Sequence, residues 1–117
     1  MMLSEKVKRE IIEVINRRLP GEKLVILFGS FARGKTDRIS DIDIAVFAGR
    51  RLESDLFVDL QETLNEEVHT LREIDLVDLA DVHSDLIRRV LDEGVVWINS
   101  EGLLKDLKGL LENMKRS

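Results

Sequence analysis

Four short runs rich in Ile, Val and Leu constrain the fold of this chain more than any other feature. They comprise residues 24–28, 42–47, 74–79 and 95–98. Runs of this length with many β-branched residues are typical of strands in a sheet. In the second run Ile42, Ile44 and Val46 alternate with their neighbours, which is the period of a strand. The sequence therefore predicts a sheet built from four strands.

Apolar residues at helical spacing fill the segments around these runs. The predicted helices lie within residues 3–19, 52–68, 86–91 and 103–114. Pro20-Gly21 ends the first of them and Gly94 ends the third. The resulting order is helix, strand, strand, helix, strand, helix, strand, helix. We expect residues 1–117 to form a single α/β (α+β) domain, in which a small mixed sheet is flanked by helices.

The charge balance restricts the class of partner. The chain has 18 Lys and Arg against 23 Asp and Glu, a formal net charge of −5 and a pI near 5.1. Proteins that bind nucleic acid without sequence preference carry a basic face, so DNA or RNA is not the expected partner. A nucleotide that brings Mg²⁺ with it remains compatible, because the metal offsets the repulsion between phosphates and acidic protein.

The compartment is predicted from two absences in the sequence. No apolar run approaches the roughly 20 residues that are needed to span a bilayer, and the chain contains no cysteine. It can therefore form neither a disulfide framework nor a zinc–thiolate site. The expected location is the cytoplasm, without a membrane.

The stretch from Leu27 to Phe47 carries the chemistry. In it Gly29-Ser30 is followed by ten residues and then by Asp41-Ile42-Asp43. Residues i and i+2 of a strand point to the same face, so the two carboxylates stand side by side. Like charges this close favour a divalent cation between them, and Mg²⁺ prefers oxygen ligands. Upstream, Gly-Ser at a strand end can bring backbone N–H groups and a hydroxyl to a phosphate.

A third carboxylate is expected to complete a site for two metal ions. The candidates lie in residues 73–78, Glu-Ile-Asp-Leu-Val-Asp. Asp75 sits inside the apolar run, where an unpaired charge is unfavourable, whereas Asp78 lies near the end of the run and can be solvated. We therefore prefer Asp75, and Asp78 stays open as the alternative.

Two segments together resemble a known family. Residues 29–34, Gly-Ser-Phe-Ala-Arg-Gly, followed by residues 40–44, Ser-Asp-Ile-Asp-Ile, look like the DNA polymerase beta-type nucleotidyltransferase superfamily. More narrowly, nearly the whole chain is similar to its minimal nucleotidyltransferases, the small prokaryotic antitoxins paired with HEPN-domain toxins. The resemblance implies a polymerase beta-like fold and Mg²⁺-dependent transfer of AMP from ATP, with release of pyrophosphate. In better-understood members the acceptor is a tyrosine of the HEPN toxin, which the modification silences.

The resemblance also implies roles for individual residues. Gly29 and Ser30 would hold the phosphates, and Arg33 would touch the triphosphate. Asp41 and Asp43 would bind two Mg²⁺ ions, with Asp75 holding the activating metal and assisting the nucleophile. We expect no additional domain of the kind by which larger relatives hold their acceptors. We therefore expect a hetero-oligomer with a HEPN-domain toxin, which would supply acceptor specificity.

A competing motif overlaps these residues. Residues 29–36, Gly-Ser-Phe-Ala-Arg-Gly-Lys-Thr, fit the P-loop pattern G-x-x-x-x-G-K-[ST] and follow a predicted strand. A P-loop also needs a helix directly after it. Only residues 37–40 separate Thr36 from the next predicted strand, which is too short for a helix and for a parallel crossover. A P-loop ATPase is therefore the weaker hypothesis.

Several features also have non-catalytic interpretations. Asp41 and Asp43 could be a solvated pair, or the chain could be a nucleotide-binding antitoxin that acts by complex formation alone. His69 and His83 are expected on helix surfaces, and Trp97 is expected in the core. The apolar stripe of residues 103–114 is expected to pack on the sheet, although a helical partner could use it instead.

Overall fold

The computed structural model describes residues 3–37 and 39–116, and its centre is a four-stranded sheet. The strands are β1 (Leu24–Phe28), β2 (Ile42–Phe47), β3 (Ile74–Asp78) and β4 (Val95–Asn99). Their order across the sheet is β3-β2-β1-β4. β1 is antiparallel to β2 and β4, while β2 and β3 are parallel. The predicted mixed sheet is confirmed.

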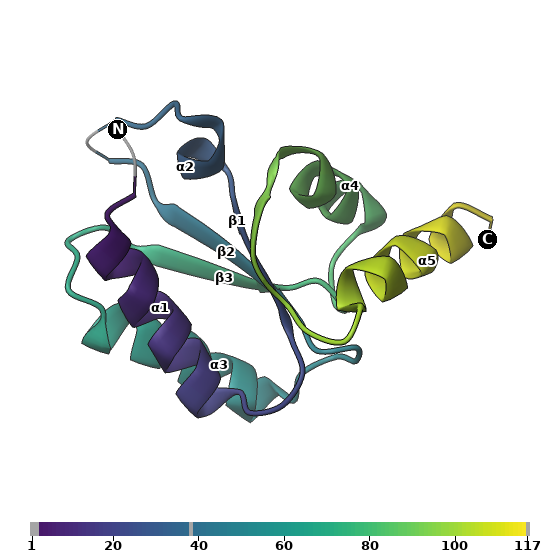
Figure 1. The fold of residues 1–117 in the computed structure, drawn as a ribbon, viewed down its shortest axis with the longest axis horizontal. Coiled ribbons are helices and arrows are strands. Elements are labelled where there is room, and N and C mark those ends of the chain that lie inside the picture. Colours follow the sequence, from purple (N-terminus) through teal and green to yellow (C-terminus); the bar gives the residue numbers. More distant parts are fainter. Residues whose placement is uncertain (1–2, 38, 117) are drawn as a thin grey trace.

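Helices cover both faces of this sheet (Figure 1). The helices are α1 (Glu5–Arg18), α2 (Ser30–Arg33), α3 (Ser54–Glu67), α4 (Ser84–Glu93) and α5 (Leu103–Arg116). α1 and α3 lie side by side on one face, and α4 and α5 lie on the other (Figure 1). None of the helices in residues 3–37 and 39–116 is both long and apolar enough to cross a membrane.

Alternation along the strands divides the core into two clusters. Val25 and Leu27 of β1, with Ile42 and Ile44 of β2, belong to the cluster under α1 and α3. The intervening residues of both strands, such as Ala45, belong to the cluster under α4 and α5. Alternate residues of a strand point to the same face of the sheet. Asp43 is two residues before Ala45, so its side chain lies on the face that α4 and α5 cover.

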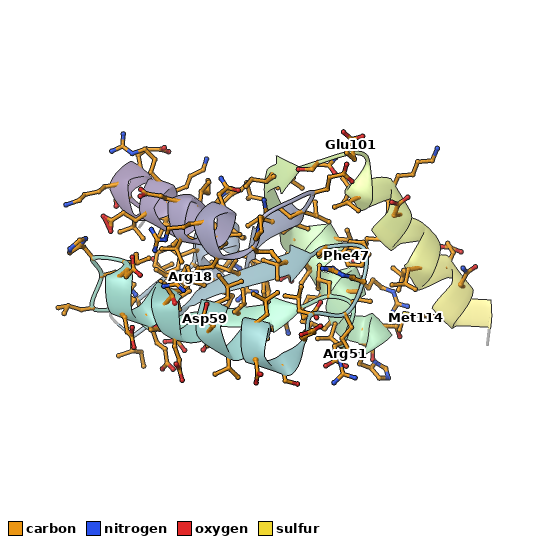
Figure 2. All side chains as sticks on the ribbon, turned by 90° about the horizontal axis from the view of Figure 1, so that it is seen from below. Arg18, Phe47, Arg51, Asp59, Glu101 and Met114 are labelled. Atoms are coloured by element: carbon orange, nitrogen blue, oxygen red, sulfur yellow. The ribbon has the colours of Figure 1, made fainter. Side chains whose placement is uncertain are left out.

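Exposed ion pairs join α1 to α3 outside the core. Arg17 binds Glu67 at 2.6 Å, and Arg18 lies 3.4 Å from Asp59. Figure 2 shows Arg18 and Asp59 next to each other between the two helices. All four side chains are more than two-fifths exposed, so each pair contributes on the order of 0–1 kcal/mol. Burial of Ile11, Val14 and Ile15, rather than these pairs, holds α1 in place.

The stripe on α5 packs as expected, with Leu103, Leu107 and Leu111 buried in the α4-side cluster. The prediction that Trp97 lies in the core is confirmed only in part, because this residue packs against the cluster under α1 and α3 but is half-buried. β4 is an edge strand, and the register between β1 and β4 shifts at Trp97. The indole also lies beneath the ammonium group of Lys8, 5.6 Å from the ring centroid.

The expectation that both histidines lie on helix surfaces is also wrong, although both are exposed. His69 follows α3 in a loop, where its backbone N–H donates to Glu10 at 2.7 Å. His83 is the N-cap of α4, and its Nδ1 accepts from the backbone N–H of Asp85. Neither contact has a signal in helical periodicity, because both occur at helix ends.

Candidate active site

Carboxylates from β2 and β3 converge on the α4 side of the sheet. The parallel register pairs Asp43 with Asp75. One step beyond the ladder, Ile42 donates its N–H to the carbonyl of Glu73 at 2.9 Å, which brings Asp41 level with Glu73. Since alternate residues of a strand share a face, these four carboxylates lie on one face. The structure therefore brings together the three aspartates that the sequence singled out.

The outer carboxylates form a group that could hold a metal ion. Asp41, Glu73 and Asp75 each offer an oxygen, and these oxygens lie within 4.8 Å of one another. Asp41 and Glu73 are exposed, whereas Asp75 is half-buried. An all-oxygen set with open positions fits a hard divalent cation such as Mg²⁺. This group includes Glu73, which we did not single out, and the metal role expected for Asp43 stays a prediction. Glu73 shares its strand face with Asp75, and this was the signal available in the sequence.

Asp43 instead lies against Gly29 at the end of β1. Its register partner is Phe28, and a Cβ at Gly29 would collide with the Asp43 carboxylate. The backbone of Gly29 has φ +73° and ψ −152°, a region that is essentially restricted to glycine. The Gly29-Ser30 turn therefore meets the carboxylates with no side chain between them, as a close approach to phosphate would require.

Repulsion among the four carboxylates helps to raise the pKa values of Asp43 and Asp75. Burial raises the pKa of Asp43, and the charges of Asp75 and Asp41 raise it further, while Arg89 and Arg33 oppose the change. Burial is also the main cause that raises the pKa of Asp75, followed by the charges of Asp41 and Glu73. A divalent cation bound among these groups would remove this repulsion.

We predict that Asp75→Asn stabilises the metal-free protein. The raised pKa means that the folded state binds more protons than the unfolded state between about pH 4 and the raised pKa of Asp75, so the free energy of unfolding falls as pH rises through this window. In EDTA at neutral pH, Asp75→Asn should raise Tm by roughly 2–5 °C. Adding Mg²⁺ should raise Tm of the wild type more than that of the variant. An unchanged or lower Tm for the variant in EDTA would contradict this account.

Arg33 lies on α2, the single helical turn that follows Gly29. Its guanidinium binds Glu93 of α4 at 3.0 Å, and both side chains are partly exposed. Arg33 lies close enough to Asp43 to oppose the rise in the pKa of that carboxyl. However, the Arg33 guanidinium is already bound to Glu93. Its contact with a triphosphate stays a prediction.

Asp78 has a structural position at the other end of β3. Its side chain is buried, and its carboxylate accepts from the backbone N–H groups of Leu52 at 2.8 Å and Ala80 at 3.0 Å. We preferred Asp75 because we expected it to be buried and Asp78 to be solvated. That expectation is wrong, since Asp78 is the more buried residue. It is retained there because backbone donors satisfy its charge.

Replacing Asp78 tests this assignment by a change in stability. Asp78→Ala leaves one buried and one partly buried N–H group without an acceptor, and should lower the free energy of unfolding by about 2–3 kcal/mol. The matched control is Asp81→Ala, which removes an exposed ion pair with Arg51 and should change stability by less than about 1 kcal/mol. Urea titration measures both. If Asp78→Ala stayed as stable as the control, the buried carboxylate would have no structural role.

The P-loop hypothesis fails on the local structure. The one helical turn, α2, precedes Gly34 and Lys35 instead of following them, and Gly34 ends it in a left-handed conformation. Among the described residues between Thr36 and Ile42 there is no helix, and Arg38 lies outside the described residues. The helix that a P-loop needs directly after its Lys-Thr pair is therefore missing from the described residues.

An open cavity of about 570 Å³ adjoins the outer carboxylates Asp41 and Glu73. Ile39 and Leu71 border it and are among the most exposed apolar side chains of the described residues, with Ile39 86% exposed. Arg72 also lines it and donates to the backbone carbonyl of Ser40 at 2.7 Å. The cavity thus offers room beside the carboxylates, with an apolar rim.

Comparison with known proteins agrees with this geometry. Protein adenylyltransferase MntA of Shewanella oneidensis is 33% identical over 87 residues, which are 74% of this chain and 61% of that protein. This chain thus spans less than two thirds of that relative. MJ0435 of Methanocaldococcus jannaschii, provisionally named a protein adenylyltransferase, is 34% identical over 91 residues, or 77% of this chain and 92% of the relative.

A solved structure with a similar fold and a family model both match this chain. One chain of a toxin–antitoxin crystal structure determined with AMP-PNP superposes with a TM-score of 0.80 at 26% identity, covering 97% of this chain and 88% of that one. Residues 9–101 match the family described as polymerase beta, nucleotidyltransferase. The match includes both Gly29-Ser30 and the carboxylates of β2 and β3. This chain belongs to the polymerase beta nucleotidyltransferase family.

Proposed function

We propose that this chain is a Mg²⁺-dependent nucleotidyltransferase that transfers AMP from ATP to a HEPN-type toxin and so acts as its antitoxin. The observation that carries the proposal is the contact between Gly29 and Asp43. It joins a turn suited to phosphate directly to carboxylates suited to metal. Family membership supports the chemistry, and the adenylyltransferase and toxin–antitoxin relatives support the acceptor and partner.

Each residue of the site has a place in the proposed reaction. Gly29 and Ser30 hold the phosphates, and Asp41, Asp43 and Asp75 hold two Mg²⁺ ions. When bound, these ions would offset the negative charge on the acceptor oxygen and on the triphosphate. Glu73 lies within the same group of oxygens, and we assign it a share in holding one ion.

The bond changes follow from nucleotidyl transfer. An acceptor hydroxyl oxygen attacks the α-phosphorus of ATP, and the new oxygen–phosphorus bond forms as the bond from the α-phosphorus to the α–β bridging oxygen breaks. Pyrophosphate leaves with the electrons of that bond. We assign Asp75 to receive the hydroxyl proton, because its carboxylate lies within the group of oxygens that could hold the activating ion.

The cavity between Ile39 and Leu71 is where we place the acceptor segment. It opens beside Asp41 and Glu73, and its exposed apolar rim suits a protein segment better than a free sugar or nucleotide. We further propose that residues 1–117 act as one domain, in the cytoplasm and in complex with the toxin. The absence of cysteine supports that compartment.

ATP labelled at either the α- or the γ-phosphate tests the proposal. The chain is incubated with Mg²⁺ and the HEPN-type protein encoded beside it, and the labelled products are separated. We expect α-label on the partner and release of pyrophosphate. Tight complex formation without transfer of label would favour an antitoxin that acts by binding alone. Release of orthophosphate that depends on Lys35 would revive the P-loop hypothesis.

A further inference from the structure

The face that receives ATP carries an excess of negative charge. Asp41, Asp43, Glu73 and Asp75 lie together on it, and a triphosphate would add more. Even with two Mg²⁺ ions, the outer phosphate oxygens of a nucleotide need donors from the protein. Arg33 is the nearest cation by sequence, but Glu93 already binds its guanidinium at 3.0 Å. A further cation from a neighbouring element would supply such donors.

Helix α4 is held beside the phosphate turn by contacts at both its inner side and its C-terminal end. Ile87 and Val90 bury its inner side on the sheet. At its end Gly94 lies so close to Ile26 of β1 that a Cβ would collide with that side chain. Glu93 then ties α4 to α2 through Arg33, and Figure 1 shows both helices at the same end of the sheet.

Arg89 occupies the side of α4 that faces the site. It lies one turn before Glu93, and residues four apart share a helix face. Its charge acts on Asp43, as does that of Arg33 on the neighbouring helix α2. The side chain is exposed, and within residues 3–37 and 39–116 it forms no ion pair shorter than 4.0 Å. By contrast, its neighbour Arg88 binds Asp85 at 3.2 Å.

We propose that the Arg89 guanidinium binds the β- and γ-phosphate oxygens of the nucleotide. This inference rests on the proposed function and adds a residue to it. A guanidinium presents paired N–H donors that match phosphate oxygens. In this position Arg89 neutralises the charge that develops on the departing pyrophosphate. Arg33, held by Glu93, then sets the position of α2 against α4, and Arg89 supplies the protein contact to the leaving group.

Nucleotide affinity with and without the outer phosphates tests this assignment. Calorimetry in Mg²⁺ compares AMP-PNP with AMP on the wild type, Arg89→Ala, Arg89→Lys and the matched control Arg88→Ala. Arg89→Ala should weaken AMP-PNP roughly tenfold to hundredfold and leave AMP unchanged. Arg89→Lys should fall between, because lysine keeps the charge and loses the paired donors. Arg88→Ala should bind both nucleotides like the wild type.

The outcomes separate this inference from the proposed function. If the wild type binds AMP-PNP and Arg89→Ala binds it equally well, Arg89 does not contact the triphosphate, although the nucleotidyltransferase stands. Equal weakening of AMP and AMP-PNP would also overturn the assignment, because it would indicate a general change in the site. A wild type that binds no AMP-PNP would instead overturn the proposed function. Circular dichroism of Arg89→Ala, an exposed position, checks that the variant is folded.

Discussion

Replacing Asp43 with asparagine should lower the rate of AMP transfer about a thousandfold or more. Asparagine keeps the shape of the side chain but removes a charge that we propose to hold metal beside the Gly29-Ser30 turn. Loss of several kcal/mol of charge stabilisation in the transition state corresponds to this factor. The measurement is the initial rate of α-label transfer to the partner at saturating ATP.

The control for Asp43→Asn is Asp81→Asn, an exposed carboxylate beyond the far end of β3, which should transfer AMP like the wild type. The Asp43 variant should also melt at or above the wild-type temperature without metal, because burial and neighbouring carboxylates raise the pKa of Asp43. Its loss of activity then cannot come from unfolding. Transfer by Asp43→Asn at a rate near that of the wild type would remove Asp43 from the site.

Gly29→Ala should reduce AMP-PNP affinity and AMP transfer by about a hundredfold or more. The alanine Cβ would collide with the Asp43 carboxylate, so either the turn or the carboxylate must move. A displacement on the order of 1 Å at a positioned reacting group can lower a rate about a hundredfold. Strain adds a loss of stability, because Gly29 has a backbone conformation that other residues rarely adopt.

Gly34→Ala is the matched control for this change. Gly34 has φ +70°, close to the +73° of Gly29, and lies in the same segment, but a Cβ there would meet nothing within 4 Å. This variant should lose about 1 kcal/mol of stability from its left-handed backbone and keep its nucleotide affinity. If the two variants lost AMP-PNP affinity equally, the collision with Asp43 would not be the cause.

The parts of the site that could be predicted from the sequence are properties of single strands. Alternation within residues 41–47 places Asp41 and Asp43 on one face, and the glycine before Ser30 indicates a close approach. The structure places both features together, as expected. The parallel pairing of β2 with β3, which sets Asp43 opposite Asp75, comes from the tertiary fold. Without this pairing, the preference for Asp75 over Asp78 rested on the expectation that Asp75 is the more buried of the two. In the structure Asp78 is the more buried residue.

The remaining parts depend on contacts between elements far apart in the chain. Glu73 joins the carboxylates only because β3 lies beside β2. Arg89 belongs to the site only because Gly94 brings the end of α4 onto β1. In the same way, the half-exposed position of Trp97 follows from the place of β4 at the sheet edge and from its irregular register. Helical or strand periodicity carries no information about such neighbours.

The intact mass of the HEPN-type partner is the most direct test of the central claim. The partner is incubated with ATP and Mg²⁺ and either the wild-type chain or Asp43→Asn, and both reactions are analysed by mass spectrometry. We predict that the wild type increases the partner mass by one or more whole AMP units, and that neither Asp43→Asn nor a reaction with EDTA does so. A partner that forms a stable complex with the wild type, yet keeps its unmodified mass, would contradict a transferase.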